Sequence, residues 1–142
     1  GVQTCALPIS TGWDWVSLQF DNDDQNALML FQIRREDGSI QPESSASWIQ
    51  ADGSNSYLRA NNFDLRVTDW WTSDITGIDY PAGWRITIPE IDLELTGKPM
   101  MNNQEVLVST SYWEGAVEFE GSLAGEPITA EGYFEMTGYT AE

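Results

Sequence analysis

The stretch Trp13-Asp-Trp-Val-Ser-Leu-Gln-Phe20 and the later stretch Ala27-Leu-Met-Leu-Phe-Gln-Ile-Arg34 decide the fold class of this chain. Both are rich in aromatic and branched side chains, which favour β-strands. Residues 21–26 between them are mostly Asp and Asn, which favour turns. Neither stretch shows the apolar period of an amphipathic helix. The two stretches therefore predict a β-hairpin.

Further short stretches of the same kind follow, separated by turn residues. The clearest covers residues 84–88, where Trp84, Ile86 and Ile88 alternate with Arg85 and Thr87 as in a half-buried strand. Strands are also predicted over residues 45–50, 56–60, 63–70, 91–96, 105–109, 113–123 and 128–139, with a long loop over residues 71–83. We therefore expect an all-β, antiparallel fold of about eight to ten strands.

The predicted hairpin has large apolar side chains on both of its faces. Trp13 and Trp15 point to one side, and Val16, Leu18 and Phe20 point to the other. A sheet with one face in water alternates apolar with polar residues, which this hairpin does not do. We therefore expect a lumen on one side of the hairpin and a second layer on the other, such as another domain.

Length and charge limit what the chain can bind. Its 142 residues fit one domain, and 41% of them are hydrophobic, so the chain can bury a core. The net charge of −17 repels nucleic acid and anionic membranes, so neither is expected as a partner. No run approaches the ~20 apolar residues of a membrane-spanning helix, so no membrane span is expected.

The composition also restricts the available chemistry. The chain contains no histidine and a single cysteine, Cys5, which excludes histidine-based triads, an internal disulfide and Cys-X-X-Cys metal motifs. The acidic run over residues 21–24 lacks the glycine and the final glutamate of an EF-hand. We therefore expect no metal site and no cofactor, and acid–base chemistry would use residues such as Asp, Glu and Tyr.

Residues 1–9, Gly-Val-Gln-Thr-Cys-Ala-Leu-Pro-Ile, differ in character from the rest of the chain. They match the translation of a common sequencing-library adapter, which indicates a non-native segment. An ordinary frayed terminus is the alternative interpretation. We therefore assign residues 10–142 to one domain and expect no function for Cys5.

Motifs spread along residues 10–139 together resemble the C-terminal lipocalin-like domain of the carotenoid 1,2-hydratase/AttH family. These motifs are Gly12–Phe20, Leu28–Arg34 with Asp37-Gly38, Tyr80–Trp84 leading into Ile86–Pro89, Tyr112–Gly115 and Gly132–Tyr139. The resemblance implies an antiparallel lipocalin- or calycin-like β-barrel of about eight to ten strands. It also implies an N-terminal barrel of similar type in the complete protein, an apolar isoprenoid or lipid-like ligand, and a periplasmic or secreted location.

Asp14 is the first candidate catalytic residue, because it shares a strand face with Val16 and Leu18. A carboxyl group among apolar side chains has a raised pKa and can donate a proton at neutral pH. Hydration of an isoprenoid C=C bond needs such an acid, and aromatic faces would stabilise the tertiary cation until water adds. The structural alternative is an ion pair between Asp14 and Arg34 across the hairpin.

Glu114 is the second candidate catalytic residue, in the motif Tyr112-Trp-Glu-Gly115 at the start of a predicted strand. It would act as an acid or orient a water molecule near the mouth of the barrel. Its structural alternative is a pairing with one of the few cations, Arg34, Arg35 or Arg85.

Other polar and aromatic side chains are candidates for ligand binding. The predicted last strand places Tyr133, Glu135, Thr137 and Tyr139 on one face, which suits a ligand with a few oxygen atoms; a solvated outer face is the alternative. The ligand-binding candidates as a whole are Trp13, Trp15, Arg34, Trp84, Tyr112, Trp113, Tyr133 and Glu135.

Two functions stay open at this point. The domain either binds an isoprenoid-like ligand and hydrates it, or it is a non-catalytic ligand-binding or scaffold barrel that packs on an N-terminal barrel. The first requires an enclosed apolar cavity of about 300 Å³ or more with a desolvated carboxylate in its wall. A filled interior with paired carboxylates would favour the second.

Overall fold

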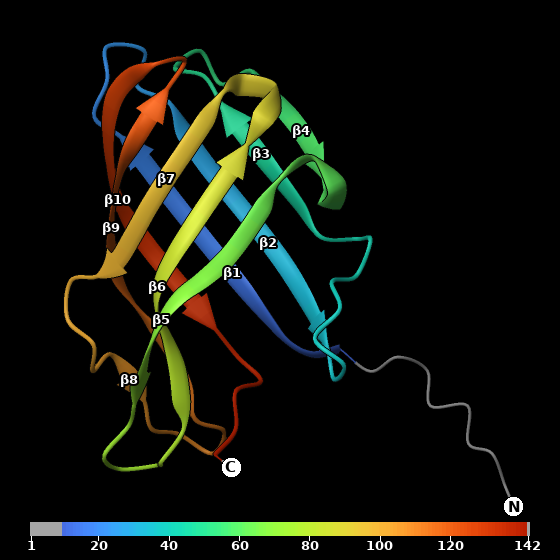
Figure 1. Ribbon diagram of the computed structural model, residues 1–142, viewed down its shortest axis with the longest axis vertical. Coiled ribbons are helices and arrows are strands. Elements are labelled where there is room, and N and C mark those ends of the chain that lie inside the picture. The colour runs from blue at the N-terminus through green and yellow to red at the C-terminus, as the bar shows by residue number, and fades with distance from the viewer. Residues whose placement is uncertain (1–9, 142) are drawn as a thin grey trace, which may run out of the picture.

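A computed structural model describes residues 10–141 and contains ten β-strands and two short 3-10 helices (Figure 1). The strands are β1 (Ser10–Phe20), β2 (Ala27–Arg35), β3 (Ser45–Ile49), β4 (Asn55–Arg59), β5 (Asp64–Thr72), β6 (Asp79–Ile88), β7 (Leu93–Pro99), β8 (Glu105–Val106), β9 (Tyr112–Leu123) and β10 (Glu126–Met136). The helices are η1 (Ala60–Asn62) and η2 (Pro89–Ile91), and within residues 10–141 no helix has the length and hydropathy to cross a membrane. The predicted all-β fold class is confirmed.

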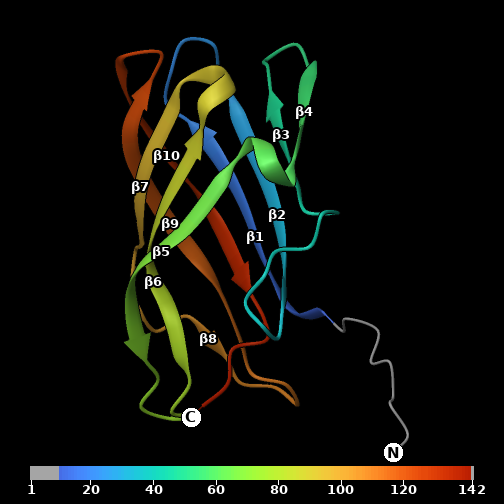
Figure 2. The same cartoon turned by 45° about the vertical axis from the view of Figure 1, so that its right-hand side comes forward.

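The strands form one curled antiparallel sheet. Its hydrogen-bonded order is β4-β3-β2-β1-β10-β9-β7-β6-β5, with β8 paired to β9. β1 pairs with both β2 and β10 and so joins strands from the two ends of the chain. β4 and β5 stand at the two edges of the curl, connected by η1 (Figure 2). The sheet is therefore a half-barrel, because the pairing found within residues 10–141 does not close between these edges.

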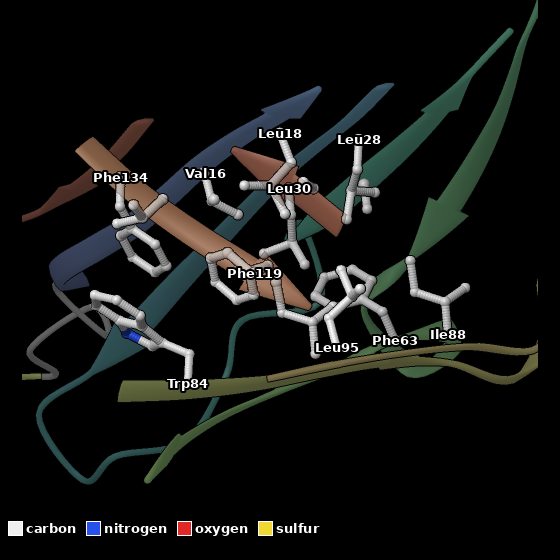
Figure 3. Close-up of a cluster of buried hydrophobic side chains, with 14 of the residues drawn as sticks. Val16, Leu18, Leu28, Leu30, Phe63, Trp84, Ile88, Leu95, Phe119 and Phe134 are labelled. Atoms are coloured by element: carbon white, nitrogen blue, oxygen red, sulfur yellow. The ribbon is translucent and has the colours of Figure 1, made fainter. Parts of the chain in front are cut away.

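The inner face of the curled sheet holds the hydrophobic core. Val16 of β1 and Leu30 of β2 have no exposed surface, and inward side chains of opposing strands meet in the interior (Figure 3). Trp84 of β6 stacks on Phe134 of β10, with ring centroids 4.4 Å apart. Core side chains thus occupy the inner side of the hairpin, where we predicted a lumen.

The two-sided character of the first hairpin is confirmed. The register pairs Trp15 with Phe31 on the outer face and Val16 with Leu30 on the inner face. Trp13 of the outer face is 38% exposed, whereas Val16 of the inner face is fully buried. The second layer expected over the outer face is not part of residues 10–141.

The long loop predicted over residues 71–83 is wrong. β5 continues to Thr72 and β6 begins at Asp79, so that Trp71 pairs with Tyr80 and Trp70 with Pro81. Pro81 is compatible with this strand because β6 pairs with β7 only from Trp84 onward, which leaves residues 79–83 with β5 as their one strand partner in the sheet.

The predicted last strand is too long at its C-terminal end. β10 ends at Met136, and the Thr137 amide then donates to the Trp13 carbonyl at 2.9 Å. Tyr139 consequently does not share the outer face with Tyr133. It packs against the core cluster of the inner face.

The turn between β9 and β10 fixes the register of the longest strand pair. Ala124 and Gly125 have φ values of 50° and 81°, which fits a two-residue hairpin of the type that matches the sheet twist. This turn places Glu135 opposite Glu114 further along the pair.

Candidate functional site

Asp14 is a buried carboxylate on the inner face of β1, with 4% of the residue exposed. The Nε of Arg34 lies 2.7 Å from its Oδ2, which confirms the ion pair that we considered as the structural alternative. The hydroxyl of Tyr139 donates to its Oδ1 at 3.1 Å. Both carboxylate oxygens of Asp14 therefore have a hydrogen-bond donor.

The surrounding strands hold Arg34 over this carboxylate. The register of the hairpin sets Arg34 opposite Gly12, two residues from Asp14, which itself lies opposite Gln32. The guanidinium carbon lies 4.0 Å from the centre of the Tyr139 ring, and the guanidinium also donates to the Thr137 carbonyl. Thr137 and Tyr139, which follow β10, thus hold the Arg34 guanidinium in place beside Asp14.

Burial dominates the electrostatics of Asp14. It raises the pKa of the carboxyl group, although the Arg34 charge and the hydrogen bonds from Arg34, Tyr139 and Gln32 act in the opposite direction. Burial and the neighbouring Asp14 charge also raise the pKa of Tyr139, so its hydroxyl stays protonated and keeps donating. Asp14 therefore retains a proton at higher pH than an ordinary aspartate.

A second carboxylate on the inner side is Glu105 of β8. Its Oε1 accepts hydrogen bonds from the Thr76 hydroxyl at 2.6 Å and the Tyr80 hydroxyl at 3.3 Å. Its Oε2 is buried and has no hydrogen-bond partner among the described residues. Burial and the Glu105 charge raise the pKa of Tyr80 to about 12. Glu105 was not among the predicted site residues. A strand was predicted over residues 105–109, whereas β8 ends at Val106, and the contacts of Glu105 with Thr76 and Tyr80 exist only in the assembled fold.

Aromatic rings connect the two carboxylates. The ring centres of Tyr139 and Tyr80 are 6.3 Å apart. Tyr139 donates a hydrogen bond to Asp14, and Tyr80 donates one to Glu105. Trp70 packs edge-on against Tyr139 at 6.1 Å, and Trp71 stacks on Tyr80 at 6.2 Å. We call this group the aromatic–carboxylate cluster; it comprises Asp14, Arg34, Trp70, Trp71, Tyr80, Glu105 and Tyr139.

The predicted site residues divide between the two faces of the sheet. Asp14, Arg34, Trp84 and Trp113 lie on the inner side, and the two indoles are core residues with 1% exposure each. The remaining predicted site residues lie on the outer face, as strand alternation requires; they are Trp13, Trp15, Tyr112, Glu114, Tyr133 and Glu135. The sheet itself therefore separates the two catalytic candidates from each other.

The outer residues form contacts of their own. The indole Nε1 of Trp13 donates to Glu135 Oε1 at 2.7 Å. Burial and the charge of Glu114 raise the pKa of Tyr133. Within residues 10–141, Glu114 forms no salt bridge with the three arginines considered for it: Arg34 pairs with Asp14, Arg85 pairs with Glu94, and Arg35 donates to the Ser39 hydroxyl.

The sheet carries an open groove of about 720 Å³, which is not an enclosed apolar cavity. Outward polar residues such as Lys98, Glu118 and Glu131 contribute much of its lining. A smaller hollow of about 350 Å³ adjoins it beside Ser17 and Tyr133. Within residues 10–141, no group of three or more acidic or cysteine side chains is arranged to hold a metal ion. The grooves therefore do not provide the enclosed site that hydration of an apolar ligand requires.

The curled antiparallel sheet and its packed inner face define a lipocalin-like fold. The chain belongs to the AttH-like family, whose model matches residues 4–139. The segment 1–9, which we interpreted as foreign, lies outside the described residues, and the family match begins within it. No curated protein matches the sequence.

Two solved structures resemble the chain. A crystal structure from Nitrosomonas europaea assigned to AttH is 34% identical, with a TM-score of 0.79 over 94% of this chain. Kievitone hydratase from Nectria haematococca is 15% identical, with a TM-score of 0.75 over 93% of this chain, a similarity that shows a shared fold. The chain spans only 40% of the length of each of these two proteins.

Proposed function

We propose that this chain is the acid-bearing lipocalin-like part of a longer AttH-like protein that binds an apolar isoprenoid or lipid-like molecule and adds water across a C=C bond. Residues 10–141 do not by themselves provide the enclosed apolar site that this reaction requires, so in this proposal the rest of the longer protein encloses the ligand beside Asp14. Asp14 is the proton donor in this proposal. The observation that carries it is the burial of the Asp14 carboxyl group beside aromatic rings, with a raised pKa.

The groups around Asp14 suit both the donation of its proton to the alkene and the later return of a proton from water. The protonated carboxyl group gives its proton to one alkene carbon, and the other carbon becomes a tertiary cation. The resulting carboxylate is stabilised by Arg34 and by the Tyr139 hydroxyl, which already contact its two oxygens. A water molecule then attacks the cation and loses a proton, which returns to Asp14, so that alkene and water give an alcohol with no net change in the acid.

Neighbouring aromatic side chains can stabilise the tertiary cation that this reaction forms. Trp70, Trp71 and Tyr80 lie within the same cluster, and their ring faces can stabilise a positive charge. Glu105 is the second carboxylate of this proposal, because its unpartnered Oε2 is an acceptor suited to the attacking water. Kievitone hydratase, by its name a hydratase, has the same fold.

A non-catalytic function is the second candidate, and two observations favour it. The inner face is filled by core side chains, and Asp14 is already paired with Arg34. In this alternative the cluster stabilises one end of the half-barrel, and the chain is a ligand-binding or scaffold domain that packs on an N-terminal barrel.

The two candidates are separated by an activity assay of the longer protein. Acyclic carotenoids and other polyprenyl compounds would be incubated with it, and mass spectrometry would detect the gain of one water. We expect Asp14→Asn to lower turnover by about 100-fold or more, the usual contribution of a general acid. Asp64→Asn is the matched control, because Asp64 is an exposed aspartate of β5 that pairs with Arg66, and its turnover should stay near that of the unaltered protein. Equal turnover of Asp14→Asn and the unaltered protein would remove the acid role.

A further inference from the structure

The segment that follows β10 crosses the end of the half-barrel at which Asp14 lies. Asp14 pairs with Met136, the last residue of β10, and Figures 1 and 2 show the chain passing from there to the hairpin between β5 and β6. A Cβ atom on Gly77, in the turn of that hairpin, would lie 3.9 Å from the Cβ of Ala141. We call residues 137–141 the strap, because they connect β10 with this hairpin across the site of Asp14.

The strap is anchored to the sheet at its first residue. The Thr137 amide donates to the Trp13 carbonyl at 2.9 Å, and the Thr137 hydroxyl accepts from the Trp13 amide at 3.2 Å. Within the described part of the chain, no backbone hydrogen bond joins residues 138–141 to the sheet. Gly138 has a φ of 79°, a conformation that glycine adopts without strain. Gly138 is therefore the point about which the strap can turn while Thr137 stays in place.

Tyr139 of the strap covers Asp14 without being part of the sheet. Arg34, the other group that holds this carboxylate, belongs to β2, and β1 is paired on both sides, so neither strand can move without breaking backbone hydrogen bonds. Tyr139 is held instead by its hydroxyl, by the Arg34 guanidinium and by the rings of Trp70 and Tyr80. Such contacts are individually weak, so the strap is the part of the site that moves most easily.

A ligand cannot reach Asp14 while the strap is in this position. Only 4% of the residue is exposed, and its two carboxylate oxygens are occupied by Arg34 and by the Tyr139 hydroxyl. A general acid must come within hydrogen-bond distance of the atom that it protonates. Access to Asp14 therefore requires that one of its neighbours moves, and Tyr139 is the neighbour that lies outside the strands.

We propose that the strap is a lid over Asp14, which opens about Gly138 to admit the apolar ligand and then closes over it. The inference rests on the proposed function and adds Tyr139 to it as a gating residue. When the lid is open, the rings of Trp70 and Tyr80 lose their contact with Tyr139 and face the entering alkene. On closure the Tyr139 hydroxyl donates to Asp14 again, as the stabilisation of the carboxylate requires. The strap is thus the movable side of the enclosure that this chain provides.

A removable disulfide across the strap tests the inference in the longer polypeptide, with its other cysteines replaced by serine. Gly77→Cys and Ala141→Cys together place two thiols at a Cβ separation of 3.9 Å, which suits a disulfide. The bond fixes the far end of the strap to the β5–β6 hairpin, and dithiothreitol releases it. A bifunctional thiol reagent joins the same pair if oxidation does not. The two single-cysteine variants are the matched controls, because each carries one substitution but cannot form the bridge.

Ligand binding and hydration are both measured, so that the lid and the reaction are tested separately. Binding of an acyclic carotenoid is followed by quenching of tryptophan fluorescence, and hydration by mass spectrometry. We expect the bridged double variant to bind about 10-fold more weakly or worse than the same protein after reduction, because the binding-competent open state is then rarely populated. Both single-cysteine variants should be insensitive to dithiothreitol.

Equal binding by the bridged and the reduced double variant would overturn the lid, since a bridge that only stabilised the fold would leave the affinity unchanged. Binding that depends on the bridge, without hydration in any form, would support the lid and overturn the hydration. Absence of binding in every form, the unaltered protein included, would overturn both.

Discussion

The two faces of the β1–β2 hairpin are both apolar, but only one of them is complete. On the inner face, Val16 and Leu30 are fully buried among core residues from the other strands. On the outer face, Trp13 and Met29 remain 38% and 42% exposed. The difference shows that this chain provides its own core but leaves a second apolar surface without a partner inside residues 10–141.

The polar groups follow the same division. Inside, Asp14 has donors on both carboxylate oxygens and is held by Arg34. Outside, Glu135 contacts an exposed indole and stands opposite Glu114. The comparison of the two faces therefore concerns the candidate chemistry as well as the packing. The first three of the following predictions test it with one inner and one outer variant, and the fourth tests the buried Asp14 alone.

The largest expected effect comes from a large-to-small change on neighbouring residues of β2. Leu30→Ala removes a fully buried side chain and should lower the free energy of unfolding by about 3 kcal/mol. Met29→Ala changes the exposed face and should lower it by less than about 0.5 kcal/mol. Guanidinium unfolding of both variants measures the difference, and equal losses would contradict the division into a complete and an incomplete face.

A smaller effect is expected from removing one cation. Arg34→Met leaves the buried Asp14 carboxylate without its cation and should cost about 2 kcal/mol at pH 7, less than a fully buried pair because Arg34 is partly exposed. Arg66→Met breaks the exposed pair with Asp64 and should cost no more than about 0.5 kcal/mol. Chemical unfolding at pH 7 compares the two, and a loss at Arg66 as large as that at Arg34 would contradict the account.

Removal of one phenol hydroxyl should have a still smaller effect. Tyr80→Phe deletes a donor to Glu105 and should cost about 1 kcal/mol. Tyr57 of β4 is 65% exposed, so Tyr57→Phe should leave the unfolding midpoint unchanged. A midpoint for Tyr80→Phe that equals that of the unaltered chain would show that the Glu105 contact is not maintained in solution.

The smallest expected effect is a difference in pH dependence. Because burial raises the pKa of Asp14 above its unfolded value, the native state holds this proton more tightly than the unfolded state. The associated stability is present below the unfolded pKa of about 3.9 and is lost as the pH rises through the higher folded pKa. In Asp14→Asn this loss is absent.

The stability of the unaltered chain relative to Asp14→Asn should therefore fall as the pH is raised above about 4. Guanidinium unfolding of the two proteins over a pH series measures this slope, and the other carboxylates cancel in the difference. A relative stability that rises with pH would show that the Arg34 charge outweighs burial.

The sequence was sufficient for features that depend on strand alternation. The two-residue period placed Asp14 with Val16 and opposite Trp13, and the hairpin made Arg34 the nearest cation; the structure confirms both. All-β class and strand number followed from the same pattern. These features are local, or extend across one turn, so few alternative arrangements compete with them.

Features that depend on distant partners could not be predicted. Pro81 favoured a loop, but β6 accepts it because that segment has a strand partner on one side. Tyr139 turns inward because β10 ends at Met136, and Arg34 and Asp14 then hold it. Glu114 and Asp14 are both carboxylates on strands, and only the assembled sheet shows that they lie on opposite faces.

Oxidation of the tryptophans tests the contrast between the two faces most directly. The indoles would be modified with N-bromosuccinimide in the 142-residue chain and in the longer polypeptide, and peptide mass spectrometry would give a rate for each one. We predict that Trp84 and Trp113 are protected in both proteins, whereas Trp13 reacts in the chain alone and is protected in the longer polypeptide. Modification of Trp84 as fast as Trp13, or an unchanged rate for Trp13 in the longer polypeptide, would contradict this account.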